Sequence, residues 1–557
     1  MLFVIRCRVL LTSLCLAAIV VQSSEAAADD GLVAHWPLRT DLKDAGPHSL
    51  MTTARGGGPL PLKDKGTKFD GVDDWLEVAP AEALKFGAKD FTVSLWVNID
   101  GQIDDLPGDL LSQFDPEQRR GWNLSVKSHA VTASQANTRT LHFGIDAGQL
   151  ETKWTDHGRL GNGMFVKALA VHDGQLFAGT CEAGKDQSGH VYRFAGGEKW
   201  IDCGSPAPCN AVSGFAPFEG KLYVGVSKYR LAGSAQKESE NPHAGGKIFR
   251  YDGDNRWFDC GQLPETESVG GLVVFQGKLY AGSLYKPAGF FRYDGGQTWT
   301  PMPLPNGKRV EALCVHNGQL FASCYDEAHI FRFDGKTWTD CGQVGPPENT
   351  QTYSFAVHHG RMYVGTWRTG KVFRYDGDNQ WADSGRLGEE LEVMGMLVHN
   401  GGLFAGSLPL AEVFRFRSQG NDSPRWDSVG RVDLTPDVTF RRAWTMAEFQ
   451  GRLFVGTLPS GRVLSIAAGT NVTHDQALPT GWQHLAAQRA SRELKLFLNG
   501  RLVATSAAFD PKLYDLSTNA PLRIGFGPTD HLNGQLRDVR LFNQAIAPEK
   551  ISDLARP

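Results

Sequence analysis

The chain has 557 residues, which is too long for one ordinary domain and fits two large β domains. It contains 64 glycines and only 21% charged residues, a composition typical of turn-rich β structure rather than helix. The net charge of -4 excludes a strongly basic surface, so nothing in the charge indicates binding to nucleic acid or to an acidic membrane.

Residues 1–28 are predicted to be a signal peptide. Arg6 and Arg8 precede an apolar run from Val9 to Val21, and three alanines at 26–28 offer a cleavage site. The apolar run is too short to span a bilayer comfortably, and no second such run follows it. The mature chain is therefore expected to be soluble and exported, either secreted or periplasmic, without a transmembrane segment.

Residues 29–152 show the alternation of apolar and polar residues that is typical of strands covering one core. The clearest runs are 31–38, 68–78 and 91–97. This segment has too few strands to close a two-sheet core alone, so a partner segment is expected further along the chain.

Residues 153–469 contain seven copies of one pattern, each with an apolar run, a glycine turn, two short strands and a Trp-x-Asp strand. The turn glycines recur every 41 to 57 residues, a range typical of propellers and solenoids. They are Gly174, Gly220, Gly277, Gly318, Gly360, Gly401 and Gly451. Four short strands per repeat, bounded by turn residues, predict an all-β propeller with seven blades.

The two ends of the repeats predict how the propeller closes. The first Trp strand, at Trp154, precedes every other strand of the repeats, whereas the last repeat ends at Ile466 without a Trp strand. The Trp154 strand is therefore expected to complete the last blade and to pair two open sheet edges. This closure brings residues near 153 and 469 together, which is what insertion into another domain requires.

Seven cysteines remain after the signal peptide. Cysteine shares its position in the Trp-x-Asp-x-Gly strand with Met, Val, Ser and His, which indicates a packing position rather than a disulfide or metal framework. Cys203 with Cys209 is the alternative pair.

Residues 470–557 show the alternating pattern again, at 481–486 and 536–542, with a hairpin around Asn499 and Gly500. The phrases Phe-Asp-Gly-Val-Asp-Asp at 69–74 and Leu-Phe-Leu-Asn-Gly-Arg-Leu-Val-Ala at 496–504 resemble those of the laminin-G-like, concanavalin A-like jellyroll family. The resemblance implies an all-β chain in which one jellyroll sandwich, built from both end segments, is interrupted by the inserted propeller.

An alignment on the turn glycines indicates a ligand site. Six residues before the glycine the side chain is always small, as expected where blades crowd around an axis, whereas seven before it the chemistry varies freely. In a propeller these positions share a face with the loops between the second and third strands, which carry aromatic residues. An insertion at 228–246 is placed to cover this face. The predicted ligand-binding residues are Lys167, Arg309, Glu311, Tyr353, Trp367, Arg442, Trp444, Tyr285 and Tyr325.

Three functions remain open. The first is a non-catalytic exported protein that binds a glycan or cell-surface protein through the propeller rim, the jellyroll or both. The second is a glycoside hydrolase or lyase, because the turn at 293–299 resembles the Asp boxes of sialidase-type propellers, although kelch repeats are equally similar in length. Arg309, Arg442, Tyr353 and Glu311 suit sialidase chemistry, but the Phe-Arg-Ile-Pro motif is absent. The third is a structural scaffold at the cell surface.

No metal site is predicted, and calcium is an alternative at one place, where a polar turn after Phe69 is the preferred interpretation. Asp70, Asp73 and Asp74 offer oxygen ligands of the kind calcium prefers. A histidine recurs two residues before the turn glycine, but phenylalanine shares this position, so these histidines are interpreted as packing residues. No catalytic residue is predicted.

Overall fold

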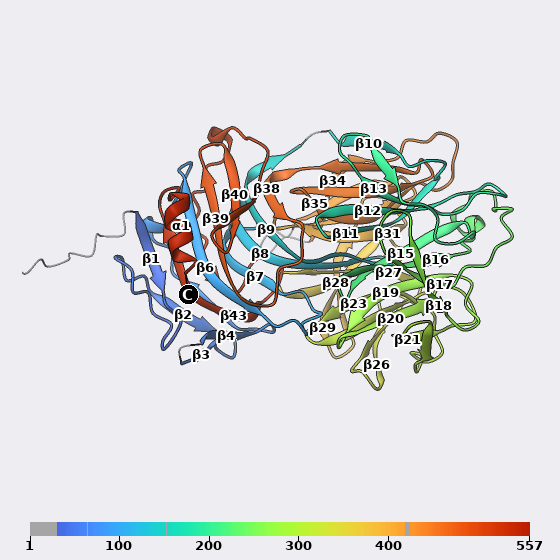
Figure 1. Cartoon of the computed structure of the whole chain (residues 1–557), viewed down its shortest axis with the longest axis horizontal. Coiled ribbons are helices and arrows are strands. Elements are labelled where there is room, and N and C mark those ends of the chain that lie inside the picture. Colours follow the sequence, from blue (N-terminus) through green and yellow to red (C-terminus); the bar gives the residue numbers. More distant parts are fainter. Residues whose placement is uncertain (1–30, 64, 152, 418–423, 557) are drawn as a thin grey trace, which may run out of the picture.

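The structure is a computed structural model that describes residues 31–63, 65–151, 153–417 and 424–556. The predicted signal peptide lies outside these residues. Strands dominate the described chain, which otherwise contains α1 (Pro548–Leu554) and short 3-10 helices at Glu82–Leu84, Leu231–Ser234 and Pro511–Leu513. None of its helices is long and apolar enough to cross a membrane. The first and last parts of the described chain lie in one body, and the middle of the sequence forms a second (Figure 1).

The first body is a sandwich of two antiparallel sheets that mix strands from both end segments. One sheet has the order β3 (Leu60–Leu62), β4 (Gly66–Asp70), β43 (Asn533–Phe542), β6 (Phe91–Ile99), β39 (Gly481–Ala490), β40 (Glu493–Leu498), β41 (Arg501–Thr505), with β1 (Leu32–Trp36) beside β43. The other has the order β2 (Thr52–Arg55), β5 (Trp75–Val78), β42 (Leu522–Ile524), β7 (Gly108–Asp115), β8 (Arg120–Val131), β9 (Ser134–Leu150), β38 (Ala468–His474). Because β6 lies between β43 and β39, neither segment can form this sheet alone.

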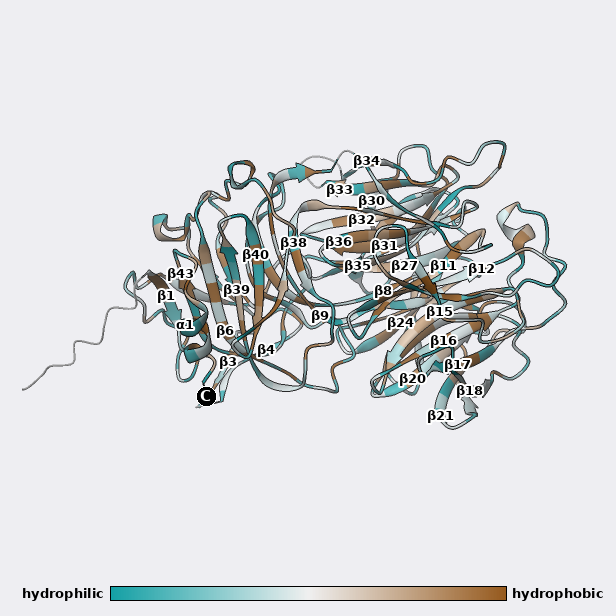
Figure 2. Ribbon diagram, turned by 45° about the horizontal axis from the view of Figure 1, so that its top comes forward, coloured by the Kyte–Doolittle hydropathy of each residue, from teal (hydrophilic) through white to brown (hydrophobic). Residues whose placement is uncertain are grey.

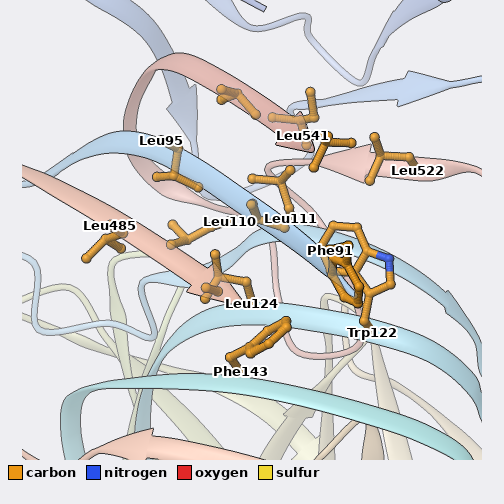
Figure 3. Close-up of a cluster of buried hydrophobic side chains, with 14 of the residues drawn as sticks. Phe91, Leu95, Leu110, Leu111, Trp122, Leu124, Phe143, Leu485, Leu522 and Leu541 are labelled. Carbon is orange, nitrogen blue, oxygen red and sulfur yellow. The ribbon is translucent and has the colours of Figure 1, made fainter. Parts of the chain in front are cut away.

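The core of the sandwich lies between the two sheets and draws on both segments (Figure 3). Phe91 of β6 packs on Trp122 of β8 with ring centroids 5.6 Å apart, and on Phe143 of β9 at 6.0 Å. Leu485 and Leu541, from the C-terminal segment, are fully buried in the same cluster. Truncating one of the buried rings to alanine costs about 3–5 kcal/mol in comparable cores.

The second body is a propeller with seven four-stranded blades in the described residues. Blades one to four are β11 (Phe165–His172), β12 (Gln175–Cys181), β13 (Val191–Phe194), β14 (Trp200–Asp202); β15 (Ala211–Phe218), β16 (Lys221–Ser227), β17 (Lys247–Tyr251), β18 (Trp257–Gln262); β19 (Val269–Phe275), β20 (Lys278–Ser283), β21 (Phe290–Gly295), β22 (Thr298–Pro301); β23 (Val310–His316), β24 (Gln319–Cys324), β25 (His329–Phe333), β26 (Trp338–Gln343). Blades five to seven are β27 (Gln351–His358), β28 (Arg361–Trp367), β29 (Lys371–Gly377), β30 (Gln380–Arg386); β31 (Glu392–His399), β32 (Gly402–Leu408), β33 (Glu412–Arg417), β34 (Arg425–Arg431); β35 (Arg442–Phe449), β36 (Arg452–Leu458), β37 (Arg462–Ile466), β10 (Thr155–Arg159).

The last blade is closed by a strand from the start of the propeller, which confirms the closure predicted from the unmatched Trp strand. β10 pairs with β37, with Thr155 opposite Ser465. The guanidinium of Arg462 donates to the carboxylate of Asp156 across this pair at 2.6 Å. Two strands distant in sequence therefore hold the ring of blades together.

The repeated tryptophan links each blade to the preceding one. In every blade the indole N–H of the outer-strand tryptophan donates to a backbone carbonyl of the neighbouring outer strand, or of one of the two residues after it, at 2.8 to 3.1 Å. Because the acceptor is a backbone atom, the side chain at that position is free to vary. The seven cysteines of the described chain are buried and unpaired, Cys203 and Cys209 included, in agreement with a packing role.

A hairpin of the sandwich fills the channel of the propeller. β8 and β9 extend from the sandwich toward the blades (Figure 2). Between them they contact the innermost strand of all seven blades. At the tip, the carbonyl of Ala133 accepts a hydrogen bond from the N–H of Leu272 at 3.1 Å. A Cβ added at Gly214 would lie 2.6 Å from this carbonyl, and one at Gly395 would lie 2.9 Å from the side chain of Val131. The small residues therefore make room for the hairpin as well as for neighbouring blades.

The face of the propeller that carries the turn glycines docks on the sandwich. The N–H of Gly277 donates to Asp104 at 3.0 Å, that of Gly318 to Asp105 at 3.1 Å, and that of Gly451 to Thr473 at 3.0 Å. Each of these glycines has a φ near +70°, a conformation that favours glycine. The sandwich therefore covers one face of the propeller, and the strand starts point to the opposite face.

A charged cluster is buried where the hairpin meets the blades. The carboxylate of Glu448 lies 3.2 Å from the Lys127 ammonium, 3.1 Å from His142 and 2.7 Å from His399. The recurring histidines at this face are thus polar partners as well as packing residues, because His316 also lies 3.4 Å from Asp530 of the sandwich.

Candidate functional site

A pocket of about 310 Å³ lies on the propeller face opposite the sandwich. The innermost strands begin here and end at the docked glycine turns, so residues at their first positions gather around the pocket. Seven of the nine predicted residues line it: Tyr285, Arg309, Glu311, Tyr325, Tyr353, Arg442 and Trp444. The alignment on the turn glycines therefore identifies residues that converge in space.

The other two predicted residues lie differently. Lys167 adjoins the pocket, because its ammonium lies 4.8 Å from the ring centre of Tyr229 and 5.8 Å from that of Trp444. Trp367 lies apart from the pocket lining and packs edge-on against Phe440 at 6.3 Å.

Aromatic rings form the walls of the pocket. Tyr353 meets Tyr325 edge-to-face at 5.9 Å and Trp444 at 6.0 Å. Trp444 is only 2% exposed, and its indole N–H donates to the carbonyl of Lys167 at 2.8 Å. Rings fixed in this way offer flat surfaces without losing conformational freedom on binding.

Two arginines at the rim are already neutralised. Arg309 stacks on Tyr325 at 4.2 Å and donates to both oxygens of Asp326. Arg230 stacks on Tyr285 at 4.5 Å and pairs with Glu267. These side chains shape the rim and add little net charge.

The insertion at 228–246 forms one wall of the pocket. Its 3-10 helix at Leu231–Ser234 begins at two N–H groups, of Leu231 and Ala232, that donate to the carboxylate of Glu238 at 3.1 Å each. The hydroxyl of Tyr229 bonds to Ser234 at 2.7 Å. Ala232, Gly233 and Glu238 line the pocket, so the inserted loop narrows the open face of the propeller.

Four buried charged side chains lie at or beside the floor of the pocket, and two of them have a polar atom that the described residues leave unsatisfied. Lys167, Glu311, Glu392 and Arg442 have exposed fractions of 1%, 3%, 2% and 7%. Within the described residues, one carboxyl oxygen of Glu311 and the Nε of Arg442 have no hydrogen-bond partner. Arg442 donates to the Tyr229 hydroxyl at 3.3 Å. Buried polar atoms are usually satisfied, so these groups mark a place for ligand atoms.

Burial controls the protonation of this floor. It raises the pKa of Glu311 to about 7, although Lys167 and Arg309 oppose the rise. It raises the pKa of Glu392 to about 7 as well, against the charge of Arg442. Burial lowers the pKa of Lys167, and for Arg442 the surrounding Tyr229 and Glu392 outweigh burial and raise the pKa. Near neutral pH the carboxyls are therefore partly protonated while Arg442 stays charged.

Glu392 and Tyr229 belong to the site but were not among the predicted residues. Glu392 begins β31 and stands two residues before the aligned position, in the same register as Arg309 and Arg442. Tyr229 begins the insertion and is 7% exposed. Both positions are visible in the sequence, because Glu392 shares the register of Arg309 and Arg442, and Tyr229 lies in the same inter-strand loop as Tyr285 and Tyr325 do in their repeats.

The three aspartates of the sandwich lie close together. Their carboxylate oxygens at Asp70, Asp73 and Asp74 all lie within 4.8 Å of one another. Asp70 closes the turn by accepting the N–H of Val72 at 2.8 Å, whereas one oxygen of Asp74, a 7% exposed residue, has no partner in the described chain. This donor set fits a calcium ion and also serves the predicted polar turn.

A model of the concanavalin A-like lectin/glucanases superfamily, Laminin_G_3, matches residues 443–552. The sandwich is a concanavalin A-like jellyroll, and the inserted repeats form a seven-bladed propeller. The match begins in β35 of the last blade and covers most of the C-terminal sandwich strands.

Solved structures resemble this chain at low sequence identity and with TM-scores below 0.5. A streptogramin B lyase is 10% identical, with a TM-score of 0.43 over 57% of this chain and 97% of that one. Virginiamycin B lyase from Staphylococcus aureus is 11% identical, with a TM-score of 0.43 over 57% and 99%. The extracellular domain of the putative hybrid two component system BT4673 from B. thetaiotaomicron is 13% identical, with a TM-score of 0.42 over 64% and 47%. No curated protein matches the sequence.

Proposed function

We propose that this chain is an exported, non-catalytic binding protein that recognises a glycan or another cell-surface molecule through the propeller pocket. The observation that carries the proposal is the polar floor under aromatic walls, since one carboxyl oxygen of Glu311 and the Nε of Arg442 have no hydrogen-bond partner among the residues that the structure describes. Sugar recognition needs this combination, because ring faces stack on aromatic side chains and hydroxyls bond to fixed polar groups.

The test is a glycan array probed with the mature protein, with and without calcium. Tyr325→Ala removes one wall of the pocket and is expected to weaken binding about 5-fold or more, since an aromatic contact contributes about 1 kcal/mol. Phe258→Ala is the matched control, because this exposed aromatic residue of β18 lies outside the pocket lining. Equal losses in both variants, or binding that survives Tyr325→Ala, would remove the pocket from consideration.

A glycoside hydrolase or lyase is the second candidate, and one observation favours it. Glu311 and Glu392 are buried carboxyl groups whose pKa values rise to about 7, the range of general acids and bases, and both influence Tyr353. Release of new reducing ends from an array-positive glycan would establish catalysis, and its loss in Glu311→Gln would assign the residue. Intact glycan after prolonged incubation leaves binding as the function.

A further inference from the structure

Two cations in the pocket floor lack the partners that other buried cations have. Lys127 pairs with Glu448 at 3.2 Å, and Arg489, which has no ion pair in the described chain, donates to the backbone carbonyls of Gly87, Tyr514 and Pro511. Among the described residues, Lys167 has no ion pair, and Arg442 has none either and makes one long hydrogen bond, to the Tyr229 hydroxyl at 3.3 Å. An unpaired buried charge is strongly unfavourable unless a ligand compensates it.

The two cations face the same place. Lys167 and Arg442 both approach the ring of Trp444, at 5.8 and 5.5 Å from its centre. Both also contact Tyr229, the ammonium through the ring face at 4.8 Å and the guanidinium through the hydroxyl at 3.3 Å. One anionic group entering the pocket could therefore interact with both.

Glu311 and Glu392 do not fully neutralise the positive charges of Lys167 and Arg442. Glu311 and Glu392 are buried enough that their pKa values rise to about 7, so near neutral pH each is protonated part of the time. A protonated carboxyl group donates a hydrogen bond and does not repel an anion. The floor is thus able to accept a carboxylate together with a proton.

We propose that the pocket binds one sugar unit that carries a carboxylate, with the carboxylate between Lys167 and Arg442 and the ring against the tyrosine walls. This inference rests on the proposed function and names its ligand class. A volume of about 310 Å³ is near the lower limit of small-molecule sites, which suits a single terminal unit rather than a length of polysaccharide.

The proposal fixes the sign of the pH dependence. A bound carboxylate disfavours ionisation of Glu311 and Glu392, so binding is accompanied by proton uptake. Affinity for an acidic sugar therefore falls as the pH rises through about 7, by several-fold between about pH 6 and about pH 8. A neutral sugar has no such dependence.

The experiment compares acidic sugars with matched neutral ones on the intact mature protein. The probes are glucuronate with glucose, galacturonate with galactose, and N-acetylneuraminate with its methyl ester, measured by calorimetry or ligand-observed NMR. At least one acid is expected to bind about 10-fold or more tightly than its neutral partner, the effect of one charged hydrogen bond. Lys167→Met and Arg442→Met are expected to remove this preference, whereas Lys278→Met, an exposed lysine on the docked face, should keep it.

Each result has a consequence. Equal binding within the pairs overturns the carboxylate inference and leaves glycan binding standing. No binding by any probe overturns the inference that a single acidic sugar unit is the ligand, and the glycan array then decides the proposed function separately. A preference that survives Lys167→Met and Arg442→Met places the anion elsewhere. If a variant fails to fold, the comparison within each pair and its pH dependence still decide the question, because both use the unmodified protein.

Discussion

Glu311→Gln is expected to stabilise the folded protein above about pH 7. Burial raises the pKa of this carboxyl from its ordinary value of 4.5 to about 7, because few groups satisfy the charged form. In the unfolded chain this carboxyl loses its proton at a lower pH than in the folded protein. The free energy of unfolding of the natural protein therefore falls as the pH rises from about 4.5 to about 7. A rise of roughly 2.5 pKa units corresponds to about 3 kcal/mol, and glutamine does not incur this loss.

The assay is thermal or urea unfolding from about pH 5 to about pH 9, with Glu448→Gln as the matched control. Glu448 is equally buried, but His142 and Lys127 outweigh burial and hold its pKa well below the usual range. Its glutamine variant leaves Lys127 unpaired and is expected to lose about 3–5 kcal/mol. Opposite signs for the two variants support the reasoning. A Glu311→Gln curve parallel to that of the natural protein would refute it.

Three further predictions concern the fold and the aspartate cluster. Gly214→Ala places a methyl group against the tip of the β8–β9 hairpin and is expected to lower the free energy of unfolding by about 1–3 kcal/mol. Gly233→Ala is the control and should be neutral, because its added Cβ meets no atom within 4 Å. Equal melting temperatures of the two variants would contradict the placement of the hairpin in the channel. Calcium at about 100 times its dissociation constant is expected to raise the free energy of unfolding by about 3 kcal/mol, and Asp74→Asn should abolish this gain. If calcium does not stabilise the natural protein, the three aspartates form a polar turn and not a calcium site. Replacing 151–467, the propeller, with a two-residue turn is expected to give a soluble sandwich only when the hairpin tip at 128–139 is shortened as well. A soluble, monomeric sandwich that keeps the full hairpin would show that the tip does not need the propeller to cover it.

The repeat and the closure of the ring could be predicted because both depend on local pattern. Each blade repeats its strands and turns, and an unmatched Trp strand has only one open edge to pair with. The hairpin could not be predicted, since Val131 and Ala133 look like ordinary strand residues in the sequence. Their burial depends on contacts with blades far along the chain, and the small residues around them already had an explanation in blade packing.

The alignment found most of the pocket because the innermost strands are equivalent under rotation about the propeller axis. Residues at one register, such as Lys167, Glu311 and Trp444, must then form a ring. Trp367 does not line the pocket, although it stands opposite Gln351 and Glu392 in the strand ladder and packs at the edge of the cluster that contains Tyr353 and Trp444. Loop aromatic residues have no common register, so their direction is not fixed by the repeat.

The docked sandwich determines where a ligand can act on the propeller. It covers the glycine-turn face and fills the channel, so the pocket opens on the remaining face. Both ends of the channel contain a buried lysine and glutamate, but Lys127 and Glu448 form an ion pair whereas Lys167 and Glu311 do not. The charges of Lys127 and Glu448, at the interface between the two domains, thus neutralise each other within the protein. Those beneath the open pocket remain available, which is why we assign recognition to this end of the propeller.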